Sequence, residues 1–69
     1  MNLAIVGATG LVGKMFLEIL EERNFFYNKI YLVASKLSSG KQIKFKNQVH
    51  VVLTIEDILH KKIDLAFFS

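Results

Sequence analysis

Residues 2–13 read NLAIVGATGLVG, a short apolar run that leads into three glycines at positions 7, 10 and 13. An apolar run that stops at a glycine is typical of a strand buried on both faces of a parallel sheet. From residue 11 onward the apolar residues recur with the period of a helix. The stretch therefore predicts a strand over 2–6, a glycine turn, and a helix over 11–23.

A second buried strand is predicted at residues 30–34, so that strand, helix and strand span about 33 residues, the length of a βαβ unit. Such a crossover predicts two parallel strands. Asn24, which tolerates left-handed backbone, is expected to end the helix. The apolar face of the helix is expected to carry Val12, Met15, Phe16, Ile19 and Leu20.

The remaining residues predict smaller elements. Alternation from Ile43 and a return over 49–53 predict a small, half-exposed hairpin. Thr54 is expected to cap a short helix over 55–60, and residues 63–69 read as a third buried strand. The expected fold class is α/β, a truncated, partial Rossmann-like parallel sheet built from the βαβ unit, the hairpin and the further strand.

The glycine turn lies where dinucleotide-binding folds hold a phosphate. Gly7 permits a tight turn, Gly10 lets backbone amides approach a pyrophosphate, and Gly13 lets helix and strand pack closely. The N–H groups of residues 9–12 then face the ligand at the positive end of the helix dipole, and Thr9 adds a hydroxyl. The spacing G-x-x-G-x-x-G is a variant of the common fingerprint, and a strand-to-helix turn without a ligand is the alternative interpretation.

The loop after the second strand, residues 34–41, reads ASKLSSGK and contains no carboxylate. NAD-preferring folds usually place an acidic residue there for the ribose 2′-hydroxyl. Hydroxyl and ammonium groups suit a 2′-phosphate instead. The residues therefore favour NADP over NAD, the alternative being a polar loop that meets no ligand.

Charge and composition narrow the class of protein. The net charge is +3, and four of the lysines (Lys36, Lys41, Lys44 and Lys46) fall within eleven residues. They form either an anion-attracting cluster or a solvated hairpin surface. Without a reader motif, and with one arginine, nucleic acid is not an expected partner. No secretory signal or bilayer-length apolar run is present, so we expect no membrane partner and a cytoplasmic location.

Other chemistry is not expected from these residues. The chain has no cysteine, and neither His50 nor His60 has a partner nucleophile or metal-ligand spacing nearby in the sequence. We expect no catalytic residue and no metal ligand. At 69 residues, 52% of them apolar, the chain resembles part of a larger domain more than an independent one.

Four stretches together resemble the amino-terminal part of the aspartate-semialdehyde dehydrogenase family. They are the glycine turn at 6–13, the helix end at 20–25, the loop at 34–41 and the closing DLAFFS at 64–69. The resemblance implies that residues 1–69 are the amino-terminal part of an NAD(P)-binding Rossmann domain. It also implies a second, catalytic and dimerisation domain outside this chain, and a homo-oligomer at full length.

The resemblance further implies an activity. The family reduces aspartyl phosphate to aspartate semialdehyde with NADPH, in lysine, threonine and methionine biosynthesis, using a cysteine, a histidine and substrate-binding residues that lie outside residues 1–69. The cofactor-binding residues expected from the turn and the family pattern together are Gly7, Thr9, Gly10, Leu11, Val12, Ser35, Leu37 and Ser38.

One residue departs from the family pattern. The family usually has an arginine where this chain has Leu37, and leucine can pack on adenine but cannot pair with a 2′-phosphate. Two alternatives remain open: the related N-acetyl-glutamyl-phosphate reductase, and a non-catalytic Rossmann homologue that acts as a binding module.

Overall fold

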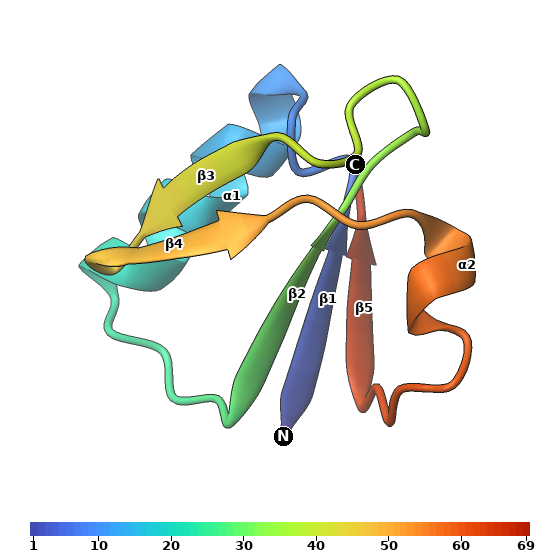
Figure 1. The fold of residues 1–69 in the computed structure, drawn as a ribbon. Helices are drawn as coiled ribbons and strands as arrows, with labels where there is room; N and C mark the ends of the chain where they lie inside the picture. The colour runs from blue at the N-terminus through green and yellow to red at the C-terminus, as the bar shows by residue number, and fades with distance from the viewer.

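A computed structural model describes all 69 residues. Its main sheet has three parallel strands in the order β2-β1-β5, formed by β1 (Asn2–Val6), β2 (Lys29–Val33) and β5 (Leu65–Phe68). All three strands end at the same edge of the sheet (Figure 1). The central strand β1 is buried on both faces, as its apolar run predicts. The predicted α/β fold with a parallel sheet is confirmed.

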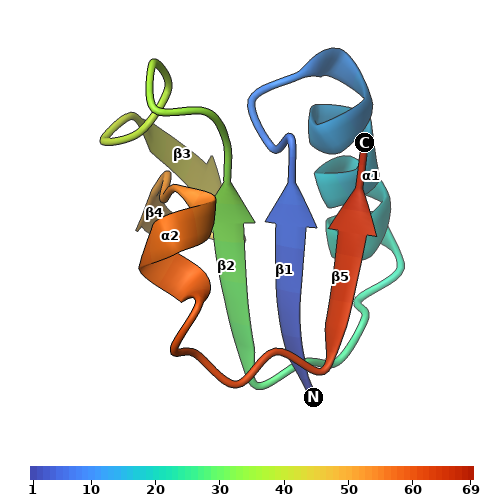
Figure 2. The ribbon, with the colours of Figure 1, turned by 90° about the vertical axis from the view of Figure 1, so that its right-hand side faces the viewer.

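The other elements cover the two faces of this sheet. Helix α1 (Leu11–Glu22) connects β1 to β2, and the antiparallel hairpin of β3 (Gln42–Phe45) and β4 (Gln48–Val51) follows. The short helix α2 (Ile55–Ile58) precedes β5. Figure 2 shows α1 and the hairpin behind the sheet, and α2 in front of it. Neither helix has the length and apolar character needed to cross a membrane.

The hydrophobic core lies between the sheet, α1 and the hairpin. Phe16 of α1 stacks on Phe67 of β5 with 3.8 Å between ring centroids, which ties the helix to the last strand. Phe45 extends the core towards the hairpin, whose outer residues stay exposed, as expected of a half-exposed element. The core cluster consists of Leu3, Ile5, Ala8, Leu17, Leu20, Ile30, Leu32 and Phe45.

The buried face of α1 differs from the prediction. The structure buries Gly13, Leu17 and Leu20, whereas Met15 and Ile19 are about half exposed and Val12 is exposed as well. The prediction was right for Leu20 and for the partly buried Phe16, which packs against the core. The face is rotated because Gly13, which has no side chain to count as apolar, is the point at which the helix touches the turn after β1. The helix ends as expected, with Asn24 in the left-handed region at φ 54°.

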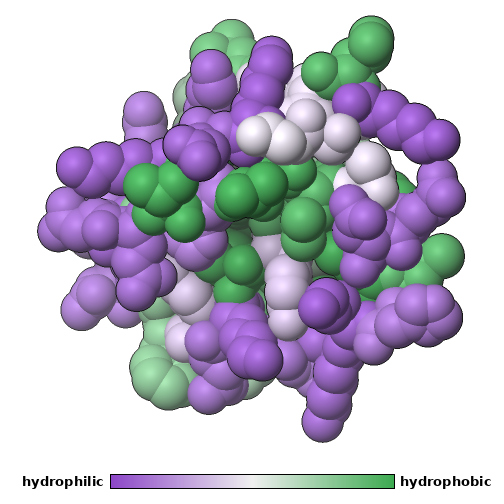
Figure 3. Space-filling model, in the orientation of Figure 1, coloured by the Kyte–Doolittle hydropathy of each residue, from purple (hydrophilic) through white to green (hydrophobic).

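The third strand predicted from the sequence is present as β5, but the prediction that it is buried is wrong. Strand β5 pairs with β1 alone, and its Leu65 and Phe68 are exposed. An edge strand has one neighbour, and here only its α1-facing side is covered, through Phe67. Figure 3 shows apolar patches among hydrophilic side chains on the face viewed in Figure 1.

A close backbone contact joins the start of α1 to the turn that precedes it. A Cβ atom on Gly13 would overlap the carbonyl oxygen of Gly7 and come within 2.9 Å of the Cα of Ala8. Gly7 itself has φ +88°, and a Cβ there would overlap the Ser69 hydroxyl. The missing side chain of Gly13 thus lets α1 rest directly on the end of β1, and that of Gly7 leaves room for Ser69 after β5.

Substitution of Gly13 by serine tests this packing. The helix would gain roughly 0.5 kcal/mol of propensity, but overpacking against backbone that cannot move costs about 1–3 kcal/mol. We expect the free energy of unfolding to fall by about 2 kcal/mol in urea denaturation. The matched control is Gly10→Ser, whose Cβ would meet nothing closer than 3.4 Å and whose hydroxyl suits a helix N-cap. A Gly13→Ser protein as stable as this control would contradict the packing account.

Candidate functional site

The carboxyl edge of the sheet contains an open cleft of about 560 Å³. Ligands of open α/β sheets bind outside the carboxyl ends of the strands, which makes this edge the candidate site. Its walls come from the ends of β1 and β2, the start of α1, the start of α2 and the last residue of the chain. The lining residues are Val6, Gly7, Thr9, Gly10, Leu11, Val12, Ala34, Ser35, Ile55 and Ser69.

Hydrogen bonds hold the glycine turn rigidly at this edge. The N–H groups of Gly7 and Ala8 both donate to the carbonyl oxygen of Val33, at 2.8 and 3.1 Å, which fixes the turn to the end of β2. Gly10 donates to the carbonyl of Gly7 at 3.0 Å. The Ser69 hydroxyl donates to the same carbonyl at 3.2 Å, so the turn is also tied to the residue after β5. The floor of the cleft is therefore preformed.

The first turn of α1 leaves backbone donors free at the cleft. The N–H groups of Thr9, Leu11 and Val12 donate to no protein atom, and the first regular bond at this end runs from Lys14 to Gly10. The N-cap residue is Gly10, so no side chain caps this end of the helix, and no acidic side chain lies in the first turn. A row of unpaired donors at the positive end of a helix dipole is suited to an anion.

Gly10 keeps this row of donors accessible. A Cβ atom there would contact only the Gly7 carbonyl, at 3.4 Å, so nothing in the fold requires a glycine at this position. Its backbone is extended, with φ −80° and ψ 169°, a conformation open to any residue. Gly10 lines the cleft together with Thr9, Leu11 and Val12, so a side chain added there would occupy space beside their amides. The residues therefore fit a phosphate that approaches the backbone closely.

The loop after β2 forms the rim of the cleft through successive turns. The N–H of Ser38 donates to the carbonyl of Ser35 at 2.9 Å, and Gly40 donates to Val52 at 2.9 Å. Ser35 lines the cleft. Leu37 is 94% exposed at the tip of the loop, and Ser38 is partly buried within it.

The structure brings together six of the eight residues singled out from the sequence, from Gly7 to Ser35, in the lining of one cleft. Leu37 and Ser38 lie outside that lining, in the rim loop. The other four lining residues, Val6, Ala34, Ile55 and Ser69, were not among the predicted site residues. Ser69 could have been predicted from the sequence, because it follows the carboxyl end of an expected strand. No local feature of the sequence placed Ile55 at this edge of the sheet.

Ile55 reaches the cleft through a contact between distant segments. Leu53 forms a parallel bridge with Val33, donating to Leu32 at 2.8 Å and accepting from Ala34 at 2.9 Å. This bridge extends the sheet beyond β2 by one residue pair and places α2 beside the end of β2.

The lysine cluster of the sequence is dispersed in space. Lys46 turns away to the far end of the hairpin, where its ammonium lies 4.9 Å from the centre of the Tyr27 ring and donates to the carbonyl of Phe25. At that end, burial and then the charge of Glu21 raise the pKa of Tyr27. His50 packs against Phe45 on the hairpin and does not line the cleft. Of the four lysines, Lys36 alone lies next to a lining residue in the sequence.

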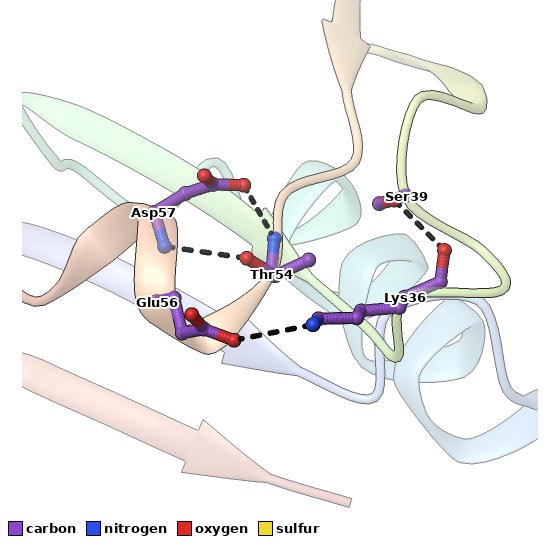
Figure 4. A network of polar contacts seen from close by, with 5 residues as sticks. All are labelled: Lys36, Ser39, Thr54, Glu56 and Asp57. Carbon is purple, nitrogen blue, oxygen red and sulfur yellow. Dashed lines mark hydrogen bonds and ion pairs between the residues drawn. The ribbon is translucent and has the colours of Figure 1, made fainter.

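A reciprocal cap fixes the start of α2. The Asp57 N–H donates to the Thr54 hydroxyl at 3.3 Å, and the Thr54 N–H donates to the Asp57 carboxylate at 2.9 Å (Figure 4). The N-cap predicted at Thr54 is thereby confirmed, although the helix ends at Ile58. The backbone N–H of Thr54, and then its hydroxyl, hold the pKa of Asp57 below the ordinary value of 3.8.

The parallel strands, the glycine turn and the cleft at the carboxyl edge are those of a dinucleotide-binding domain of the Rossmann class. Residues 2–69 match the family model described as semialdehyde dehydrogenase, NAD binding domain. The chain belongs to this family, and the resemblance seen in its sequence motifs is confirmed.

Individual relatives are similar to this chain over nearly its whole length. The aspartate-semialdehyde dehydrogenase of Rickettsia bellii is 52% identical over 68 residues, 99% of this chain and 20% of the relative. The crystal structure of aspartate semialdehyde dehydrogenase II from Vibrio cholerae, complexed with ASA, superposes with a TM-score of 0.90 at 40% identity, over 99% of this chain and 22% of that one. A protein of Azotobacter vinelandii named USG-1 protein homolog is 44% identical over 68 residues, 99% of this chain and 20% of its own length. The chain thus spans about a fifth of the length of the curated relatives it matches.

The cap at α2 predicts a specific pH dependence. Because the folded-state pKa of Asp57 is lowered, its contribution is present above the unfolded-state pKa of about 3.9 and is lost as the pH falls through the folded-state value. We expect Asp57→Ala to lower the unfolding temperature at pH 7 and to have a vanishing effect in strong acid. Glu22→Ala, a carboxylate without a bonding partner, is the control. A deficit of Asp57→Ala that stays constant over the acid range would contradict the cap.

Proposed function

We propose that the cleft binds the pyrophosphate of a nicotinamide dinucleotide. The observation that carries this proposal is the row of unpaired N–H groups at Thr9, Leu11 and Val12, facing a cleft that Gly10 leaves open. Gly7 shapes the turn that presents them. The family match to an NAD-binding domain supports the same ligand.

We further propose that the cofactor is NADP(H). The cleft has Ser35 in its lining and no carboxylate there, and the rim loop contributes Ser38 and Lys36. Leu37, exposed at the tip of that loop, is suited to cover the adenine by apolar contact. Hydroxyl and ammonium groups favour the charged 2′-phosphate over a 2′-hydroxyl.

The reaction that we propose for the whole protein is the reductive dephosphorylation of aspartyl phosphate to aspartate semialdehyde, with NADPH as the hydride donor, in the cytoplasm. The names of the Rickettsia and Vibrio relatives support it. Residues 1–69 contain no cysteine. We therefore assign them the role of binding and orienting the cofactor, and assign the thiol, the acid-base histidine, the substrate site and oligomer formation to a second domain.

A binding module without dehydrogenase activity is the second candidate. It is favoured by the 44% identity to a relative that carries a different name, USG-1 protein homolog. The two candidates share the cofactor cleft and differ in turnover. Oxidation of NADPH by the purified whole protein with aspartyl phosphate separates them, since the module would bind the nucleotide without consuming it.

Calorimetric titration of the purified protein with NADPH and with NADH tests the ligand and its preference. We expect both to bind and NADPH to bind more tightly, because the lysine and serine side chains at the rim meet an additional charge. Equal or tighter binding of NADH would overturn the proposed NADP preference. Failure of both nucleotides to bind would overturn the site itself.

Gly10→Val tests the role of the turn. A Cβ atom at this position would contact only the Gly7 carbonyl, at 3.4 Å, so a β-branched side chain can be added there and would occupy the cleft beside the amides. We expect NADPH and NADH to weaken alike, by about ten-fold or ~1.4 kcal/mol, because both use the same pyrophosphate approach. Lys29→Val, at the amino end of β2, is the matched control and should leave both affinities unchanged. Unchanged binding in Gly10→Val would refute the phosphate role of the turn.

A further inference from the structure

An ion pair at the rim of the cleft joins the loop after β2 to the short helix α2. The ammonium of Lys36, in the loop after β2, lies 3.7 Å from the carboxylate of Glu56 in α2 (Figure 4). Each partner is the sequence neighbour of a cleft-lining residue, Ser35 on one side and Ile55 on the other. Glu56 thus supplies a carboxylate beside the end of β2, although the β2 loop itself has none.

This pair contributes little to the fold. Its side chains are 82% and 73% exposed, and exposed ion pairs are worth about 0–1 kcal/mol because water and salt screen them. The cap of α2 uses Thr54 and Asp57 and leaves the Glu56 carboxylate out. A lysine held so weakly can exchange partners when a stronger anion arrives. A phosphate monoester, with roughly twice the charge of a carboxylate, is such an anion.

The carboxyl end of β2 is also where a dinucleotide places its 2′ substituent in this class of fold. A 2′-phosphate at the rim would attract Lys36 and repel Glu56. A 2′-hydroxyl carries no charge and would disturb neither. The two kinds of cofactor therefore interact differently with the same ion pair.

We propose that the Lys36–Glu56 pair determines how strongly the cleft discriminates between phosphorylated and unphosphorylated dinucleotides. Glu56 competes with the 2′-phosphate for Lys36 and lowers the preference for NADP(H). Lys36 supplies the positive charge that Leu37, at the tip of the same loop, cannot provide. This inference rests on the proposed nucleotide site.

The test is the ratio of the NADH to the NADPH dissociation constant in the purified protein and its variants. Glu56→Gln frees Lys36, and we expect the ratio to rise about three-fold, the size of one exposed charge pair. Lys36→Gln is expected to lower the ratio by a similar factor. In the double variant the effect of Glu56→Gln should shrink, because no lysine remains to be released. Glu22→Gln and Lys29→Gln change the same charges away from the cleft and should leave the ratio unchanged.

The possible results distinguish a failure of this inference from a failure of the proposed nucleotide site. If both nucleotides bind and neither Glu56→Gln nor Lys36→Gln moves the ratio beyond its value in the controls, the discrimination proposal is overturned and the nucleotide site stands. If neither nucleotide binds the unaltered protein, the proposed site fails and this inference fails with it. Unchanged unfolding temperatures in the two variants exclude an effect through folding.

Discussion

The close contact between Gly13 and the Gly7 carbonyl is the constraint on which the rest of this structure depends. A helix that follows a strand through a tight turn must pass over the strand's own backbone, and any side chain at the crossing would hold the two apart. With a hydrogen in place of a side chain at Gly13, α1 lies close enough to the sheet for Leu17 and Leu20 to join the core. The same approach aims the first turn of the helix at the carboxyl edge of the sheet. Packing and ligand geometry therefore share one cause.

The local parts of this arrangement could be predicted from the sequence because their causes are local. The apolar run of β1, the glycines and the Thr54 cap each act within a few residues. The buried face of α1 could not be read from apolar periodicity, because the residue at its centre is Gly13, whose contribution is the absence of a side chain. The exposure of Phe68 likewise depends on which strands flank β5 in space, and strand order is not a local property.

The candidate site divides in the same way. Thr9, Gly10, Leu11 and Val12 were identifiable because a glycine turn between a strand and a helix has a known geometry. Ile55 and its neighbour Glu56 were not, since α2 is placed beside the cleft by the bridge of Leu53 to Val33, which joins segments 20 residues apart. The contact between these distant segments changes the charge beside the cleft. The loop after β2 reads as free of acid in the sequence, yet in space a carboxylate stands beside it.

Amide hydrogen exchange at the first turn of α1 tests the central claim most directly. The N–H groups of Thr9, Leu11 and Val12 have no partner in the protein, so they should exchange rapidly without nucleotide and become protected when NADPH saturates the cleft. The N–H of Lys14, which donates to Gly10 already, is the internal reference. NADPH binding without new protection at these three amides would contradict the account, because the phosphate would then be held elsewhere.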